Sequence, residues 1–194
     1  MNHFAHLYLA RPSVESRVGN LLGDFARGLD PEQLPAPVRS GLEHHRAVDA
    51  FTDAHPEVLA CKALFSSSRR RFAGIALDIL FDHYLLRHWD RFGHCNKSGF
   101  IHELYRDLEQ GAGLMPEDMA KVTRRMVNHD WFHAYQDLDK VGMAMDRVAQ
   151  RIRFRHQFAG IIEEIRPLDD ELEARFLAFF PDLKAFSDAR SLGN

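Results

Sequence analysis

Residues 74–89, GIALDILFDHYLLRHW, constrain the fold more than any other stretch, because they combine the pattern of a buried helix with ionisable side chains. Apolar residues occur all round this segment, which is typical of a helix packed inside a core. Asp78, Asp82 and His83 lie among them. Burying an ionised carboxylate costs several kcal/mol unless a partner compensates it. The segment therefore predicts a core helix whose acids are satisfied by a cation or by hydrogen bonds.

The remaining sequence predicts an all-α protein. Ser13 is a candidate N-cap for a helix over 14–27, and Gly28 is suited to end it. Further helices are expected over 38–53, from Pro56, and over 70–90, 100–110, 116–135, 137–154 and 169–190, the last with a break near Pro181. No alternating strand pattern, internal repeat or low-complexity stretch occurs. A chain of 194 residues fits one helical-bundle domain over 1–194.

The charge distribution bears on possible partners. The net charge of −3 gives no argument for binding nucleic acid. Basic clusters nevertheless occur at 66–72, 123–126 and 151–156. They are either solvated helix faces or a docking surface for an acidic partner.

Other features of the sequence indicate a cytoplasmic protein. The two cysteines, Cys61 and Cys95, are too few for a disulfide framework, which favours a reducing compartment. The first residues do not resemble a secretory signal, and no run of about 18 apolar residues predicts a membrane span.

Polar side chains recur at one-turn spacing on three of the expected helices. The pairs are Asn20 with Asp24, His45 with Asp49, and Asp78 with Asp82, which His83 follows directly. Residues four apart lie on one helix face, and helical bundles build interior metal sites from such inward-facing acids and imidazoles. Taken singly, each residue is equally compatible with a core polar role or an ion pair to Arg46, Arg71 or Arg87. Taken together, they favour a site for a divalent cation.

The donor set favours Mn²⁺ or Mg²⁺ over structural zinc, because it is rich in oxygen and neither cysteine has a zinc spacing. The chain contains no GxSxG, Walker A, GxGxxG or HExxH motif. His6, in HFAHLYLA, stays ambiguous, and His3 is expected to be a surface or packing residue.

Several blocks of the sequence resemble one known family. They are MNHFAHLYLA, VGNLLGDFARG, HHRAVDAFTDAHP, RRRFAGIALDILFDHYLLRHW, NHDWFHAY and FLAFFPDL, in order from residue 1 to about 186. Together they are similar to the acyl carrier protein phosphodiesterases. The resemblance implies metal-dependent hydrolysis of the phosphodiester between 4′-phosphopantetheine and a serine of holo-acyl carrier protein, in the cytoplasm and within fatty acid biosynthesis. It implies Mn²⁺, with Mg²⁺, Fe²⁺ or Co²⁺ as alternatives, and a fold distantly related to the HD-type phosphohydrolases.

Residue roles are assigned from chemistry, because Asp82–His83 reverses the His–Asp order of the HD superfamily. The expected metal ligands are Asp24, His45, Asp82 and His83, with Asp78 as a fifth ligand or a partner of the ligands. Arg46 is expected to stabilise charge on the phosphate, and Asp49 to orient water or protonate the leaving oxygen. Asn20 is expected to bond a phosphate oxygen or to fix Asp24.

The expected partner is the acidic holo-acyl carrier protein, docked on Arg69, Arg70 and Arg71, with no nucleic acid and no membrane. Two alternatives stay open from the sequence. One is an HD-like phosphohydrolase that acts on a nucleotide, and the other is a non-catalytic helical binding module.

Overall fold

The computed structural model describes residues 1–192, and these residues form helices and connecting loops with no β-strand. The all-α prediction is confirmed. The α-helices are α1 (His3–Leu9), α2 (Val14–Leu22), α3 (Ala36–Ala54), α4 (Pro56–Leu64), α5 (Ala73–Arg87), α6 (Trp89–Phe92), α7 (Lys97–Gln110), α8 (Glu117–Asn128), α9 (Trp131–Ala134), α10 (Leu138–Ala149), α11 (Ile162–Ile165) and α12 (Asp169–Leu192). Short 3₁₀ turns connect several of them, including η1 (Gly23–Phe25) after α2 and η3 (Arg70–Phe72) before α5.

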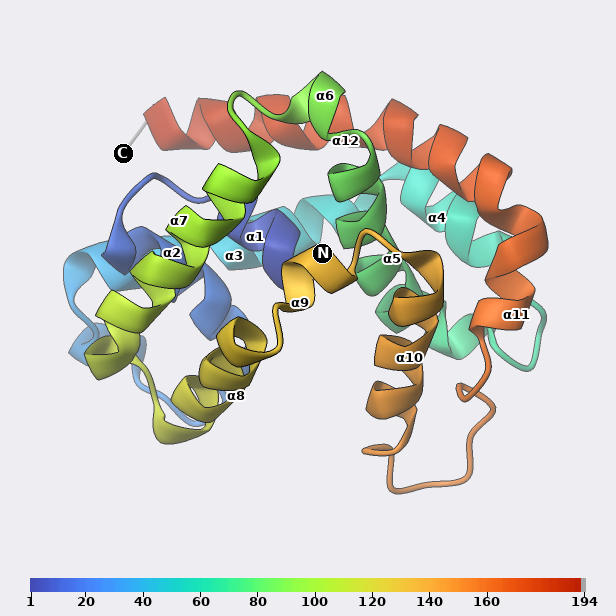
Figure 1. Cartoon of the computed structure of the whole chain (residues 1–194), viewed down its shortest axis with the longest axis horizontal. Helices are drawn as coiled ribbons and strands as arrows, with labels where there is room; N and C mark the ends of the chain where they lie inside the picture. Colours follow the sequence, from blue (N-terminus) through green and yellow to red (C-terminus); the bar gives the residue numbers. More distant parts are fainter. Residues whose placement is uncertain (193–194) are drawn as a thin grey trace.

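Helix α5 runs through the middle of the molecule, with α12 and α4 on one side and α10 beside it (Figure 1). Its side chains are buried nearly all round, as the sequence pattern predicts. One continuous apolar cluster reaches from Met1 to Leu183 and includes residues of α1, α5 and α12. This single core agrees with the prediction of one domain over 1–194, which stays a prediction.

Two glycines let α2 and α3 approach closely. A Cβ atom on Gly19 would lie 2.2 Å from the carbonyl oxygen of Val38, and one on Gly41 would lie 2.7 Å from that of Ser16. The close crossing brings the end of α2 next to the middle of α3, where His45 lies. Ser13 caps α2 as predicted, because its side chain accepts a hydrogen bond from Ser16 N.

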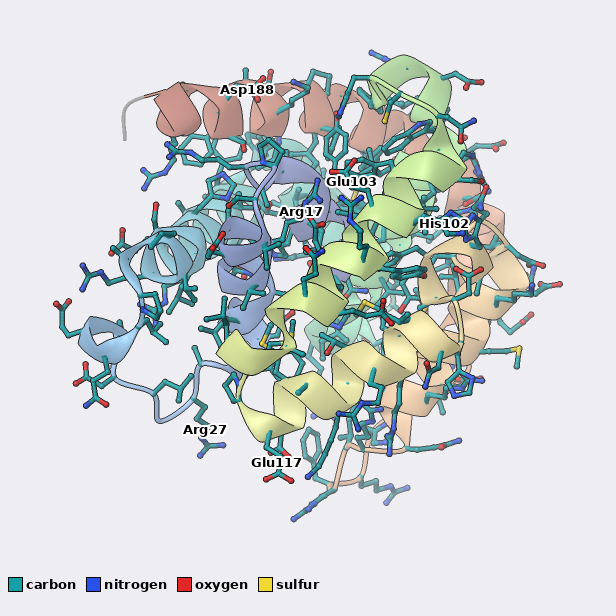
Figure 2. All side chains as sticks on the ribbon, turned by 60° about the vertical axis from the view of Figure 1, so that its left-hand side comes forward. Arg17, Arg27, His102, Glu103, Glu117 and Asp188 are labelled. Carbon is teal, nitrogen blue, oxygen red and sulfur yellow. The ribbon has the colours of Figure 1, made fainter. Side chains whose placement is uncertain are left out.

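Helix α2 is also held to α7 by a buried cation. Arg17 is only 2% exposed, and its Nη2 lies 2.7 Å from Glu103 Oε1 (Figure 2). Its Nη1 donates to the carboxylate of Asp107, which is buried on α7. A buried guanidinium needs such partners, because an unpaired buried charge is strongly destabilising.

Several expected helices differ from the structure. The helices expected over 14–27 and 137–154 end earlier, at Leu22 and Ala149. Helix α12 continues through Pro181, where a break was expected, because Phe179, Phe180 and Leu183 are buried on both sides of it. The segment 116–135 is divided into α8 and α9, since Asp130 adopts the left-handed conformation at φ 47°. Residues His3–Leu9 form a helix of their own that the sequence prediction missed.

Among the described helices, none combines the length and apolar character needed to cross a membrane.

We predict that Gly19→Ala lowers the free energy of unfolding by about 1–3 kcal/mol, as expected for overpacking at a tight contact. The added methyl group meets backbone atoms of α3, which cannot move aside as a flexible side chain does. Urea unfolding measures the change. Gly113→Ala is the matched control, because a Cβ there has no neighbour within 4 Å. Equal stability of the two variants would contradict the close crossing.

Candidate functional site

A buried carboxylate from α5 fixes the position of α1. Asp82 is fully buried, and its two oxygens each accept a backbone hydrogen bond, from Phe4 N and Ala5 N, at 2.9 Å. These N–H groups lie in the first turn of α1, where a helix has no backbone partner for them and where negative charge is favourable. Burial raises the pKa of Asp82 to about 7, although the two backbone N–H groups act in the opposite direction. The helix that carries His3 and His6 is therefore anchored to the core.

Two imidazoles and one carboxylate meet between α1 and α3. The rings of His6 and His45 stack, with centroids 3.8 Å apart and an interplanar angle of 20°. Asp49 bridges them, because its Oδ1 lies 3.0 Å from His6 Nε2 and its Oδ2 lies 3.0 Å from His45 Nε2. One ligand atom from each of these three residues falls within 4.8 Å of the others, so the group can hold a metal ion.

The protonation of this cluster suits a cation. Burial lowers the pKa of His6 to about 4, which keeps the imidazole neutral near pH 7. Burial works against ionisation of Asp49, but the adjacent imidazoles of His45 and His6 hold the pKa of Asp49 well below its usual value. Neutral imidazole and ionised carboxylate are the forms that bind divalent metals.

The ring orientation of His45 also has the geometry of a metal ligand. His45 Nδ1 lies 2.6 Å from the backbone oxygen of Asn20, and a carbonyl can only accept, so Nδ1 carries the proton. In the neutral ring, Nε2 then presents a lone pair toward Asp49 and Asp24. A metal-ligating histidine typically donates its other ring N–H to such a carbonyl. Gly23 leaves room for the ring, because a Cβ there would lie 2.0 Å from His45 Cδ2.

Asp24 and His3 extend the cluster toward solvent. Asp24 Oδ2 lies 3.0 Å from His3 Nδ1, and Asp24 Oδ1 lies 4.0 Å from His45 Nε2. Burial disfavours the ionised form of Asp24, but His3 and His45 outweigh it and lower the pKa of this carboxyl. The Asp24 side chain is 38% exposed, so an ionised oxygen faces a reactant from solvent.

The amino group of Met1 is a positive charge in contact with two carboxylates of this region, Asp49 and Asp78. The amino group of Met1 is 2.8 Å from Asp78 Oδ1 and 3.3 Å from Asp49 Oδ1. Burial lowers its pKa, but the charges of Asp78 and Asp49 prevail and raise it to about 10. Asp49 and Asp78 thus stabilise a positive charge between them, and a cation site requires the same property.

The structure brings Asp24, His45 and Asp49 together, and it joins Asp78 to Asp49 through the Met1 amino group. It does not bring Asp82 and His83 into the group that can hold a metal. Both instead bond to backbone, Asp82 in the manner described above and His83 by donation from Nδ1 to the Tyr135 carbonyl oxygen at 2.7 Å. The predicted four-residue shell therefore differs from the cluster that the fold assembles.

The side chains of the two remaining predicted residues, Asn20 and Arg46, are also not part of the cluster. The Asn20 amide donates to the Ser16 carbonyl and its oxygen lies 2.7 Å from His44 Nδ1, so only the Asn20 backbone oxygen serves the site. Arg46 is exposed on α3 and has no hydrogen bond or ion pair among residues 1–192.

Sequence reasoning missed His3 as a site residue and left His6 undecided. The signal was present, because HFAH places the two imidazoles three residues apart and three-residue spacing puts them on one helix face. It was overlooked because the first ten residues were not recognised as a helix.

A cavity of about 760 Å³ opens beside this cluster, within the range typical of small-molecule sites. His3 and Asp24 are among its lining residues, and residues of α8, α9 and α10 form much of the rest. Figure 1 shows α8 and α10 on opposite sides of this face of the molecule. Most of the remaining lining is apolar, including Phe25, Trp131 and Met143.

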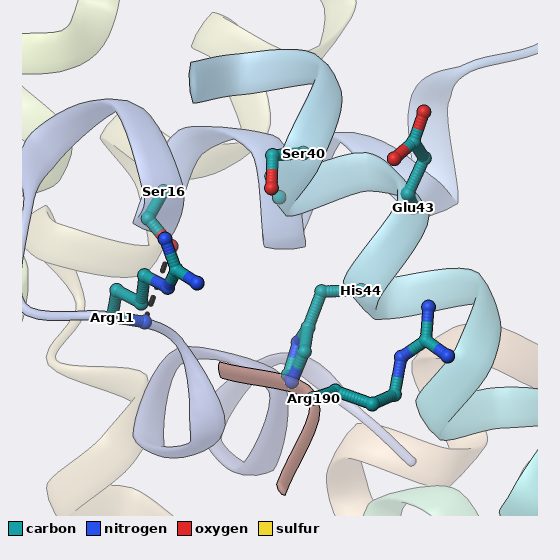
Figure 3. Close-up of a pocket in the computed structure, with 7 residues that line it drawn as sticks. Arg11, Ser16, Ser40, Glu43, His44 and Arg190 are labelled. Carbon is teal, nitrogen blue, oxygen red and sulfur yellow. Dashed lines mark hydrogen bonds between the residues drawn. The ribbon is translucent and has the colours of Figure 1, made fainter. Parts of the chain in front are cut away.

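A second hollow is lined by residues that include Arg11, His44 and Arg190 (Figure 3). Its volume is about 20 Å³, which is room for about one water molecule. It is too small for an organic substrate, so the large cavity is the candidate substrate site.

The fold and the site place the protein in a class of all-α proteins whose candidate metal centre is built from inward-facing acids and imidazoles of several helices.

A model of the family described as acyl carrier protein phosphodiesterase matches residues 1–183. Proteins named acyl carrier protein phosphodiesterase from Photorhabdus laumondii and Serratia proteamaculans are 34% and 33% identical, over 93% and 94% of this chain and 92% and 95% of theirs. One of that name from Escherichia coli K12 is 32% identical over 99% of this chain and 100% of its own. The chain belongs to the acyl carrier protein phosphodiesterase family. No solved structure gives a significant match.

We predict that Asp82→Asn lowers the free energy of unfolding by about 1–3 kcal/mol, because one of the two backbone N–H groups loses its acceptor inside the core. Chemical denaturation measures the loss. Asp90→Asn on α6 is the control, since that carboxylate is exposed. A variant as stable as the control would refute the anchoring of α1 by Asp82.

Proposed function

We propose that this protein hydrolyses the phosphodiester that links 4′-phosphopantetheine to a serine of holo-acyl carrier protein. The products are apo-acyl carrier protein and 4′-phosphopantetheine. The match of residues 1–183 to the family model carries this proposal, together with relatives of that name over nearly the full chain. The cluster beside the cavity supports it, because phosphoester hydrolysis needs groups that move protons and stabilise anionic charge.

We propose a divalent ion, with Mn²⁺ favoured and Mg²⁺, Fe²⁺ or Co²⁺ as alternatives, held by His6, His45 and Asp49. The mixture of imidazole and carboxylate suits these metals, and the tautomer of His45 leaves Nε2 free to coordinate. Asp24, whose Oδ1 lies 4.0 Å from His45 Nε2, and Asp78, which shares the Met1 amino group with Asp49, border this group. Such an ion supplies Lewis-acid stabilisation of phosphate charge and makes water a stronger acid.

The chain's own residues account for the proton movements. Asp24 is ionised and partly exposed, so its carboxylate accepts a proton from the attacking water. His3, whose Nδ1 is 3.0 Å from Asp24, is the group through which a proton returns to the departing serine oxygen. Asn20 acts through its backbone oxygen, which holds the His45 ring in place. The assignment of Arg46 to phosphate stabilisation stays a prediction.

We further propose a cytoplasmic location. Cys61 and Cys95 are free thiols, which agrees with a reducing compartment. The acidic carrier protein is the proposed partner. Arg69, Arg70 and Arg71 are the docking residues predicted from the sequence. Each donates a hydrogen bond to a backbone carbonyl of this chain, so their guanidinium groups are already partly occupied.

The direct test is incubation of the protein with holo-acyl carrier protein and Mn²⁺, followed by mass spectrometry of the carrier. We expect loss of the complete prosthetic group, with no loss after chelation and recovery when Mn²⁺ is restored. An intact holo-carrier would overturn the proposal. Hydrolysis of a nucleotide in place of the carrier would support the HD-like alternative.

Within this scheme, Asp49→Asn is expected to lower kcat by at least about a hundredfold and to weaken Mn²⁺ binding, because the carboxylate that bridges both imidazoles is lost. Asp53→Asn is the control, one turn along the same helix, where the acid makes only a surface pair with Lys62. Calorimetric titration with Mn²⁺ and the carrier assay read out both variants. Parallel behaviour of the two would remove Asp49 from the site.

A second comparison decides which histidine holds the metal. We expect His45→Gln to abolish stoichiometric Mn²⁺ binding, while His83→Gln retains it, because His83 bonds to the Tyr135 carbonyl and lies outside the cluster. Metal content after gel filtration provides the measurement. Loss of the ion from the His83 variant alone, in a folded protein, would restore the ligand set expected from the sequence.

A further inference from the structure

Helix α10 and the turn that follows it present three cationic side chains to the large cavity. Lys140, Arg147 and Arg151 all line it and all are exposed, so they form part of its rim. On α10, Arg147 follows Lys140 by seven residues, which is about 10 Å along a helix, and Arg151 lies in the turn just after α10 ends at Ala149. The rim is therefore a row of positive charge beside a cavity that His3 and Asp24 also line.

These three cations have no ion-pair partner within residues 1–192, whereas Arg17, Arg87 and Arg175 are each paired with two carboxylates. Asp24 is the one carboxylate among the described lining residues. The chain as a whole carries a net charge of −3, so this positive rim is a local feature. Unpaired cations around one opening attract an anionic partner and steer its approach.

The chemistry of the proposed substrate limits where the carrier protein can lie. Its phosphodiester is attached to a serine, whose side chain is short. The carrier surface around that serine must therefore come close to Asp24 and His3 while the prosthetic arm extends from the phosphate. The apolar part of the cavity, with Trp131 and Met143, is available to that arm.

The arginines before α5 are less suited to this contact. Arg69 donates to the carbonyl oxygens of Gln157 and Ala159, and Arg71 donates to that of Arg155 and stacks over Phe72. Their guanidinium groups hold the loop that follows α10. None of Arg69, Arg70 and Arg71 lines the large cavity.

We infer that the rim formed by Lys140 and Arg147 of α10 and by Arg151 in the turn after it is the docking surface for the acidic carrier protein and sets the affinity for it. The inference rests on the proposed function and adds the partner's binding site to it. Carboxylates beside the carrier's modified serine pair with the rim, and the phosphodiester then reaches Asp24 and His3.

The test is steady-state kinetics of the full-length protein with holo-acyl carrier protein and Mn²⁺. We expect Arg147→Glu to raise KM about fivefold, and the double variant with Arg151→Glu to raise it more than about tenfold at low ionic strength, with kcat changed less than twofold. The difference from the wild type should shrink as salt screens the charges. Arg91→Glu is the control, because Arg91 is exposed on α6 and does not line the cavity.

A wild-type KM and an unchanged salt dependence in the double variant would overturn the docking surface while the proposed activity stands. Fluorescence anisotropy of labelled apo-acyl carrier protein measures binding without turnover. Should the wild type bind the carrier but not hydrolyse it, the proposed activity fails, and the effect of the double variant on anisotropy still decides the docking surface. Weakened binding supports it, and unchanged binding refutes it.

Discussion

The Asp82 carboxylate, buried against the first turn of α1, is the interaction on which the site depends. A helix of seven residues is too short to be stable by itself, and its first N–H groups need acceptors. Asp82 supplies two of them from the middle of the core helix. Without this anchor, His3 and His6 would have no fixed position relative to His45 and Asp49 on α3.

The site is a compromise between burial and charge. His6 and His45 lie in the core, while Asp24, Asp49 and Asp78 keep side-chain exposures of 38–43%. Partial exposure lowers the cost of keeping the acids ionised, and the positive Met1 amino group and the nearby imidazoles lower it further. The same arrangement gives a reactant in the cavity access to Asp24, so the balance that stabilises the charges also makes them available for chemistry.

The cavity joins two regions of opposite charge. His3 and Asp24, which border the acid–imidazole cluster, form part of its lining, and the unpaired cations Lys140, Arg147 and Arg151 form another part. Under the proposed function, a phosphodiester on an acidic carrier protein would suit both regions, with the phosphate at the cluster and the carrier at the rim. Two basic segments of the sequence thus have different roles: the one before α5 secures a loop, and the one that begins at Arg151 continues the rim.

The sequence by itself determined the all-α class, the core position of α5, the cap at Ser13 and the candidacy of Asp24, His45 and Asp49, because these follow from periodicity and one-turn spacing within single helices. Only the tertiary structure decided which acids share a site. Asp78 and Asp82 are equivalent by spacing, yet one meets the Met1 amino group and the other meets the backbone of α1. That choice depends on how α1 and α3 pack on α5, and helix packing lies outside what local pattern encodes.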